Sequence, residues 1–498
     1  MVNSQRVTVL AMRGSGRRLL VRPRLIAGVL AVALGLNGCG GGGQSSAPPT
    51  NPNPVPSIVT TSPNSSKQGG MGFKLSVIGS NFIPSSAVQW NGSNLPTAFV
   101  SGGLITADVP ASAVSSAGPD TITVMNPPPG GGVSNSTSFS VPCMIAPPAP
   151  AAAQTRARIG AYYFDGWSGP MTNFHFNGLP YGDFKDREPL SGWQDNSECA
   201  VEQQLAWAHN FGLSFFLFEW YWNTPVTEPG DNLNSALQIT HALPDRHGMQ
   251  FAIVYATGGP FDVPAASWPS AVEEWVSYMT DPDYVRVNGK PLFVILNIDE
   301  MRSVFGTSTA VRAALDRLRS AAQAKGLPGV YVVGNFGVDE GSLGQDPLCC
   351  GFTTVGEGGY DAEQTGAGPF TAPPVSGMVP YSTMADIAHW SWDESRLHSP
   401  IASVPVFLDG WDPRPWDERS SAGILMWYSR SPQEVAQLMK DAIDWANANP
   451  ALRLEPSPAP PIVLFGSWNE VGEGNHIVPT VGEGSNYGDA IANMLTAP

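Results

Sequence analysis

The pattern of hydrophobic and polar residues divides the chain into two regions with different periods. Between residues 57 and 142, short runs such as FKLSVIGSNF, AVQWNG and TITVMNP alternate in polarity and are separated by Gly, Asn, Ser and Pro turns. A period of two residues with frequent turns is typical of a small β-sandwich. We therefore predict an all-β domain over residues 57–142.

From residue 156 to residue 498, apolar strand-like runs alternate with amphipathic helical segments. The predicted helices include 198–212, 308–326 and 431–449, where apolar residues recur at i, i+3, i+4 and i+7. Eight such strand–helix units predict an α/β fold, a (β/α)₈ TIM barrel. A doubly wound open sheet is the alternative, although DGWSGP after the first strand lacks the GxGxxG spacing of a phosphate loop. The predicted strands are RIGAYYF, SFFLFEW, QFAIVYA, PLFVILNI, GVYVVGNF, FTTVGE at 352–357, VPVFLDGW and PIVLFGSW.

The first 38 residues have the pattern of a lipoprotein signal peptide. A region with arginines and no acids precedes LIAGVLAVALGL, which is shorter than the roughly twenty residues of a membrane-spanning helix. LNGC follows and resembles a bacterial lipobox, so Cys39 is the predicted lipidation site. Because Gly40 is not aspartate, we expect the outer membrane or cell surface. An ordinary secretory signal with an incidental cysteine is the alternative.

Composition limits the classes of partner and cofactor expected for the chain after the predicted signal peptide is removed. The sequence contains 26 basic and 42 acidic residues, and removal of residues 1–38 with their six arginines changes the net charge from −16 to 20 − 42 = −22. This charge argues against nucleic acid as a partner. No cysteine or histidine spacing indicates a metal, and no cofactor is expected. Export permits disulfides, but the pairing among Cys143, Cys199, Cys349 and Cys350 stays open.

Two segments have the composition of linkers. Residues 39–56 are rich in Gly, Ser, Pro and Asn and are predicted to be a flexible tether. Residues 143–155 are rich in Pro and Ala and are predicted to be a stiffer linker. The segment between them resembles an IPT/TIG immunoglobulin-like domain in the landmarks Pro63, Gly79–Phe82 and Asn126–Pro127. We expect this domain to be a spacer or adhesion module, with ligand binding as the alternative.

Carboxylates and aromatic residues recur where the predicted barrel strands end. Functional residues of a barrel gather at these ends, and a saccharide site needs apolar faces for stacking together with charged hydrogen-bonding groups. Any one tryptophan here has core packing as its alternative, and His476 is about as compatible with a structural role. The predicted substrate-binding residues are Tyr163, Asp165, Glu219, Trp220, Tyr255, Asn335, Trp411, Trp468, Asn469 and His476.

Glu470 and Glu473 in GSWNEVGEGNHIVP are the catalytic candidates. Cleavage of a glycosidic bond uses one protonated carboxyl group and one carboxylate, and neighbouring carboxyls push their pKa values apart. Their i, i+3 spacing can bring both to one side of a turn. A solvated acidic turn is the alternative interpretation.

The same segment resembles the WbsX-like, glycoside hydrolase family 99-like proteins. DPDYVRVNGKPLFVILN at 281–297 and GSWNEVGEGNHIVPTVGEGSNYGDAI at 466–491 are the two specific landmarks, and the resemblance extends over 156–498. It implies a (β/α)₈ retaining endo-α-mannosidase. By the same resemblance, Glu473 would be the general acid/base, and Glu470 would deprotonate the 2-hydroxyl of the sugar to give an anhydro-sugar. The chain departs from the family at DGWSGPMTNFHFNG, at VYATGG and at Val471, where the family has a bulkier residue.

Together these features predict an exported, lipid-anchored glycoside hydrolase acting on a polysaccharide. The alternative is a carbohydrate-binding or adhesion lipoprotein that has no catalytic activity. A role in polysaccharide assembly is less favoured, because export removes the chain from nucleotide sugars.

Overall fold

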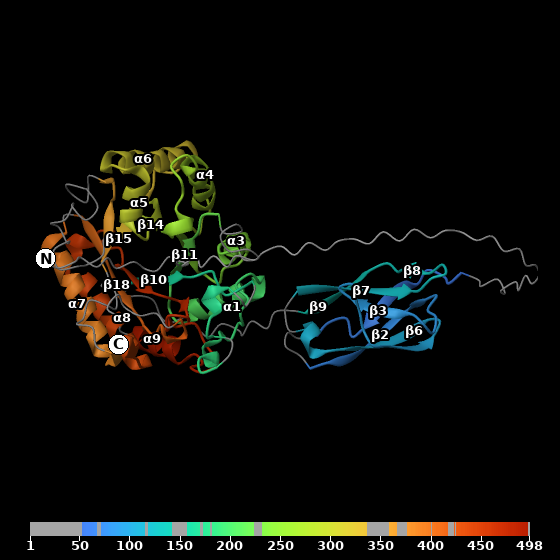
Figure 1. Ribbon diagram of the computed structural model, residues 1–498. Helices are drawn as coiled ribbons and strands as arrows, with labels where there is room; N and C mark the ends of the chain where they lie inside the picture. The colour runs from blue at the N-terminus through green and yellow to red at the C-terminus, as the bar shows by residue number, and fades with distance from the viewer. Residues whose placement is uncertain are drawn as a thin grey trace, which may run out of the picture. The chain divides into compact units, whose positions relative to one another are not determined.

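The computed structural model describes residues 52–66, 71–114, 118–141, 157–169, 173–179, 182–223, 232–335, 358–365, 376–399, 401–416, 423 and 425–496. These residues form two compact units, divided near residue 144, and each is described by itself (Figure 1). The predicted signal peptide, Cys39, the linker 143–155 and three cysteines, Cys143, Cys349 and Cys350, lie outside the described residues.

The first unit consists of two antiparallel sheets around one core. One sheet has the order β1(Ser57–Ser62), β2(Phe73–Ser80), β6(Leu104–Val109), β5(Thr97–Ser101). The other has β4(Ser93–Asn94), β3(Ala87–Trp90), β7(Gly118–Asn126), β8(Gly132–Val133), with β9(Thr137–Val141) also paired to β7. Alternate residues of these strands, including Leu75, Val88, Ile122 and Phe139, are fully buried. The prediction of a small all-β domain is confirmed.

The second unit contains a closed barrel of eight parallel strands. The pairing begins at β10, which pairs with both β11 and β20, and the β12–β14 pairing completes the ring. Because every strand has two neighbours, the open-sheet alternative is excluded. The strands in chain order are β10(Arg158–Tyr163), β11(Phe215–Trp220), β12(Gln250–Tyr255), β14(Lys290–Ile295), β15(Tyr331–Asn335), β16(Ala362–Thr365), β18(Ala402–Leu408) and β20(Ile462–Gly466).

The sixth strand was predicted in the wrong place. It was expected at FTTVGE, residues 352–357, which lie outside the described residues, whereas the barrel uses β16, with the sequence AEQT. This strand has no apolar run, yet Glu363 and Gln364 are 1% and 3% exposed. The hydroxyl of Tyr162 donates to Gln364 Oε1. Hydropathy alone misses a strand whose buried polar side chains find partners elsewhere in the fold.

Helices surround the barrel, and the predictions over 198–212, 308–326 and 431–449 are confirmed by α1, α6 and α8. Side chains of Thr307 and Ser431 accept hydrogen bonds from the first turns of α6 and α8, as N-caps do. Figure 1 shows α4, α5 and α6 together near β14, and α7 and α8 near β18. The helices are α1(Glu198–Asn210), α3(Ser235–Ala242), α4(Trp268–Met279), α5(Ile298–Phe305), α6(Ser308–Ala324), α7(Tyr381–His398), α8(Pro432–Ala448) and α9(Asn486–Thr496).

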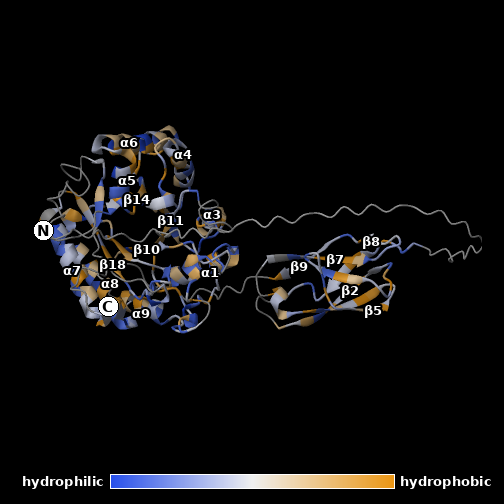
Figure 2. Cartoon of the chain, viewed as in Figure 1, coloured by the Kyte–Doolittle hydropathy of each residue, from blue (hydrophilic) through white to orange (hydrophobic). Residues whose placement is uncertain are grey.

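The barrel strands are buried on both faces, as expected for a parallel sheet covered by helices. All six residues of β11 are buried, and Figure 2 shows hydrophobic residues at the centre of the unit and mixed colours on the helices. Cys199, at the start of α1, is disulfide-bonded. None of the helices in the described part of the chain is long and apolar enough to cross a membrane.

Candidate active site

Glu470 and Glu473 lie in one tight turn directly after β20. Two short strands, β21(Asn469–Glu470) and β22(Asn475–His476), pair antiparallel and form the base of this turn. The Glu473 amide donates to the Glu470 carbonyl over 3.2 Å. Both glutamates are half-buried. The structure therefore places both glutamates on one loop, which we call the glutamate turn, residues 470–474.

Asn469 attaches the glutamate turn to the end of the first barrel strand. Its Oδ1 accepts from the Phe164 amide at 2.9 Å, and its Nδ2 donates to the Phe164 carbonyl at 2.8 Å. The indole of Trp167 donates to the Asn469 carbonyl at 2.7 Å. Asn469 is 1% exposed, and its hydrogen bonds connect the loop after β20 to the loop after β10.

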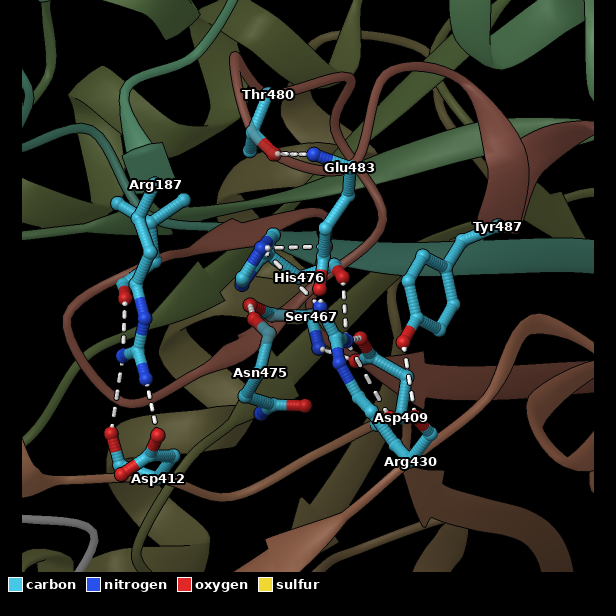
Figure 3. A network of polar contacts seen from close by, with 11 residues as sticks. Arg187, Asp409, Asp412, Arg430, Ser467, Asn475, His476, Thr480, Glu483 and Tyr487 are labelled. Carbon is cyan, nitrogen blue, oxygen red and sulfur yellow. Dashed lines mark hydrogen bonds and ion pairs between the residues drawn. The ribbon is translucent and has the colours of Figure 1, made fainter. Parts of the chain in front are cut away.

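Arg187 holds the glutamate turn against the loop after β18. It ends the 3₁₀ segment Lys185–Arg187, and its Nη1 donates to the carbonyls of Asp412 and Val471, each at 3.0 Å, and of Gly472 at 3.4 Å. Its Nη2 forms an ion pair with the Asp412 carboxylate (Figure 3). One guanidinium group thus connects three βα loops, which gives it a positioning role that a single surface ion pair lacks.

A second guanidinium group, Arg430, lies beside Asp409 and His476, with 9% of its side chain exposed (Figure 3). Its Nη1 donates to Asp409 Oδ2 at 2.9 Å and to the His476 carbonyl at 2.6 Å. Its Nη2 donates to Glu483 Oε2 at 2.9 Å and lies 3.1 Å from His476 Nε2. The guanidinium carbon also sits 4.2 Å from the centroid of the Tyr487 ring. We call Asp409, Arg430, His476 and Glu483 the Arg430 network.

The Arg430 network also fixes the start of the turn through its backbone. Asp409, at the end of β18, accepts from the Ser467 amide at 2.7 Å through its other carboxylate oxygen. The Ser467 hydroxyl donates to the Asn475 carbonyl and accepts from the Glu470 amide, both at 2.9 Å. The chain of contacts therefore runs from Arg430 to the backbone of Glu470.

Burial sets the protonation states in this network. Burial, together with the positive charge of Arg430, lowers the pKa of His476 to about 4, so the imidazole is neutral at neutral pH. Burial opposes ionisation of Glu483, but the hydrogen bond from His476 and the charge of Arg430 outweigh it and lower the Glu483 pKa to about 2. Glu483 is thus the carboxylate that keeps the buried guanidinium compensated on this side.

A third carboxyl group, Glu219, faces the same region from β11. It accepts a hydrogen bond from the Tyr221 hydroxyl, and burial raises its pKa to about 7. Burial and the charges of Glu219 and Glu470 raise the pKa of Tyr221, and burial and Glu219 raise that of Tyr162. Glu219 and Tyr221 are therefore bonded neighbours at the end of β11, and the charge of Glu470 also acts on Tyr221.

Four of the predicted substrate-binding residues lie elsewhere, in the layer between barrel and helices. The ring of Trp220 packs 5.1 Å from Trp275 of α4, and Tyr255 lies 5.3 Å from the same ring. Trp468 packs against Phe216 and donates to Gln204 of α1. Because side chains alternate along a strand, Glu219 and Trp220 cannot both face the mouth. The four residues in this layer, all at most 1% exposed, are Tyr163, Trp220, Tyr255 and Trp468.

The remaining predicted residues occupy the ends of strands or the base of the turn. Asp165 is fully buried and accepts from the Ala236 amide at the start of α3. Asn335 ends β15 half-buried, and Trp411 is 6% exposed and accepts from the Tyr428 amide through its carbonyl. His476 is 2% exposed and belongs to the Arg430 network.

Several residues of the site were missed by the sequence analysis. Arg187 lies 283 residues before Glu470, and Arg430 lies 40 residues before it. Both stand in segments with no recognisable sequence pattern. Gln364 belongs to the strand that was misplaced, and Tyr221 lies one residue beyond a predicted strand end. The only signal available for the arginines was their scarcity in a chain with 26 basic residues among 498.

Among the described residues, no group of three or more His, Cys, Asp or Glu side chains is arranged to hold a metal ion.

Family models match the first unit and the larger part of the second. Residues 264–491 match the model described as Glycosyltransferase WbsX, and residues 56–141 match the IPT/TIG domain. No curated protein matches the chain.

Solved structures give distant matches. A glycoside hydrolase-like protein is 15% identical, with 72% of this chain and 99% of that chain covered and a TM-score of 0.46. The GH99 endo-alpha-mannosidase from Bacteroides thetaiotaomicron is 14% identical, with 68% and 99% covered and a TM-score of 0.41. The TIG domain of human nuclear factor of activated T-cells, cytoplasmic 4, is 22% identical, with 18% and 87% covered and a TM-score of 0.15.

We predict that Arg187→Lys loosens the glutamate turn. A lysine ammonium cannot reach the Asp412 carboxylate and three carbonyls together, so amide hydrogen exchange over residues 470–474 should become about tenfold faster or more. Arg246→Lys is the matched control, because the Arg246 side chain is 9% exposed, against 15% for Arg187, and is bonded to Asp281, Asp283 and two carbonyls away from the turn. Unchanged exchange in Arg187→Lys, measured by mass spectrometry, would contradict the positioning role.

We also predict that His476 contributes to the loss of stability at acid pH. Its pKa is about 4 in the folded protein against an ordinary 6.5, so the unfolded chain takes up the proton first as pH falls. The contribution of His476 to the free energy of unfolding should therefore fall between about pH 6.5 and pH 4, by at most about 3 kcal/mol.

His476→Gln should flatten that part of the curve, measured by urea unfolding at a series of pH values. His175 remains and contributes in the same direction, because burial also lowers its pKa to about 4. His389→Gln, which removes an imidazole whose side chain is 44% exposed, is the control. An equal slope in wild type and His476→Gln would show that His476 is not the group responsible.

Proposed function

Because the chain contains a WbsX glycosyltransferase-like domain after an IPT/TIG domain, we propose that it is a glycoside hydrolase that acts on a polysaccharide. The observation that supports this most directly is the glutamate turn. Glu470 and Glu473 are one turn apart at the mouth of a closed barrel, on a loop fixed by Arg187 and Asn469. Two positioned carboxyl groups are what glycosidic bond cleavage needs.

We assign the two glutamates complementary tasks. Glu470 takes the proton from the 2-hydroxyl of the sugar, whose oxygen attacks the anomeric carbon while the bond to the leaving sugar breaks. Glu473 gives a proton to the departing oxygen. Water then opens the anhydro-sugar with Glu473 as base, the proton on Glu470 returns to the 2-oxygen, and the anomeric configuration is retained. This assignment rests on the family resemblance of the Trp468–Gly474 segment.

Glu219 complements this pair as a binding group. Burial raises its pKa to about 7, so a large fraction of this carboxyl is protonated at neutral pH. A neutral carboxyl group can both donate and accept hydrogen bonds, which suits a sugar hydroxyl. It also leaves Glu470 without a second full negative charge beside it, which favours ionisation of Glu470 as a base.

The second candidate function is carbohydrate binding without catalytic activity. The third is sugar transfer from an activated donor, which the name of the matching family model, Glycosyltransferase WbsX, suggests. The supported positions of both glutamates favour hydrolysis over binding alone, since binding would not require two carboxyl groups held in one turn. An α-mannoside is the substrate suggested by the family resemblance.

We predict that Glu473→Gln and Glu470→Gln lower the rate of reducing-end release from α-mannan by about 10²–10⁴-fold, the usual contribution of acid–base catalysis. Glu434→Gln, on the exposed first turn of α8, should leave the rate unchanged. Wild-type protein that binds α-mannan and releases nothing would favour the binding candidate. Cleavage by Glu473→Gln at the wild-type rate would overturn the assignment of Glu473.

We further propose that the chain is exported and anchored in the outer membrane through Cys39, with the IPT/TIG domain as a spacer. The basic and apolar N-terminal pattern followed by LNGC supports this. Cys39→Ala should abolish incorporation of labelled fatty acid and move the protein from the membrane fraction to the periplasmic or culture fluid. The Cys199→Ala variant controls for loss of a cysteine. Fatty-acid labelling that persists in Cys39→Ala would refute lipidation at this site.

A further inference from the structure

We propose that Phe174 and Trp416 form a stacking platform for a second sugar ring, next to the ring whose bond is cleaved. This proposal rests on the proposed function, because the platform is placed relative to Glu470 and Glu473. It assigns to the site an oligosaccharide bound across at least two rings, in place of a single sugar.

The position of Trp416 follows from its contact with the glutamate turn. Trp416 ends the 3₁₀ segment Arg414–Trp416 in the loop after β18. A Cβ atom built on Gly472 would lie 2.1 Å from Cζ2 and 2.6 Å from Cε2 of this indole. The ring therefore rests directly on the backbone between Glu470 and Glu473, and only glycine at position 472 leaves room for it.

Phe174 extends this aromatic surface toward solvent. It begins the segment Phe174–Phe176, and its ring centroid lies 5.6 Å from that of Trp416 with 40° between the planes. The Trp416 indole donates to the carbonyl of His175 at 3.1 Å, which fixes the ring and holds the two loops together. Two rings from loops after different barrel strands thus form one surface beside the carboxyl groups.

The exposure of this pair separates it from the core aromatics. Phe174 is 38% exposed and Trp416 is half-buried, whereas Trp220, Trp275 and Trp468 are at most 1% exposed. Exposed aromatic faces at a polar site are the surfaces on which sugar rings stack through their C–H groups. Arg414, two residues before Trp416, adds a guanidinium with 37% of its side chain exposed, a hydrogen-bond donor for hydroxyl groups.

The sequence context explains why this chain has the platform. Phe174 belongs to DGWSGPMTNFHFNG, the segment that departs from the WbsX-like pattern. Val471 stands where that family has a bulkier residue, and Gly472 follows it. The turn itself therefore provides little side-chain surface, and the ring of Trp416 occupies the space over it. The aromatic contact comes from a neighbouring loop.

The test measures oligosaccharide binding in a Glu473→Gln background, which prevents turnover. The probes are α-mannotetraose, α-glucotetraose and cellotetraose, and affinity is measured by calorimetry with the change in tryptophan fluorescence recorded in parallel. Trp416→Ala should weaken binding of the tetraose that binds best by about tenfold or more. Trp416→Phe, which keeps an aromatic face, should restore most of the affinity.

Phe174→Ala serves as a second variant, because Phe174 can be removed without emptying the space over Gly472. It should weaken binding about threefold or more. Phe99→Ala is its matched control, since Phe99 is 39% exposed and lies in the IPT/TIG unit. Trp207→Ala, which removes a half-buried tryptophan on α1, is the control for Trp416→Ala.

The outcomes separate the platform from the proposed hydrolysis. Binding that depends on Trp416 and Phe174, together with no release of sugar by the wild-type protein, would sustain the platform and overturn the hydrolase. Hydrolysis of a tetraose with binding unaffected in both variants would overturn the platform and sustain the hydrolase. Failure of all three tetraoses to bind would also overturn the platform.

Discussion

The buried guanidinium group of Arg430 is the constraint on which the site depends. Only 9% of its side chain is exposed, so its charge has to be compensated within the protein. Glu483, from the chain after the last barrel strand, provides the compensating charge, and Asp409 and the neutral His476 complete the hydrogen bonds of the guanidinium group. Removal of Glu483 would leave the buried guanidinium charge without its counterpart, which is costly. Arg430 thereby joins the end of β18 to the segment that follows β20.

Arg187 extends the same principle to the other side of the glutamate turn. It contacts the carbonyls of Val471 and Gly472 and ion-pairs with Asp412, while Asn469 bonds the turn to Phe164 of the first strand end. The barrel provides a ring of strand ends, and these polar contacts hold the loops after β10, β18 and β20 to one another. Such preorganisation is what a pair of catalytic carboxyl groups needs, because their separation and orientation must not relax when a sugar binds.

Burial then gives similar carboxyl groups different states. Glu219 has its pKa raised to about 7, whereas Glu483, bonded to His476 and next to Arg430, has its pKa lowered to about 2. The first is suited to neutral hydrogen bonding at the mouth of the barrel, and the second is a permanent anion beneath the turn. The same type of side chain is therefore partly neutral at Glu219 and charged at Glu483.

The sequence by itself determined the β-sandwich, seven of the eight barrel strands and the helices α1, α6 and α8. It also determined that Glu470 and Glu473 lie in one turn. Both results follow because hydrophobic periodicity and turn spacing are local properties of the chain. Only the tertiary structure decided which strand-end residues face the mouth, since Glu219 and Trp220 are adjacent and point to opposite faces. It also located the sixth strand, whose buried Gln364 accepts a hydrogen bond from Tyr162, 202 residues earlier. The supports of the turn were likewise hidden, because Arg187 meets Val471 across 284 residues and no short-range pattern encodes that contact.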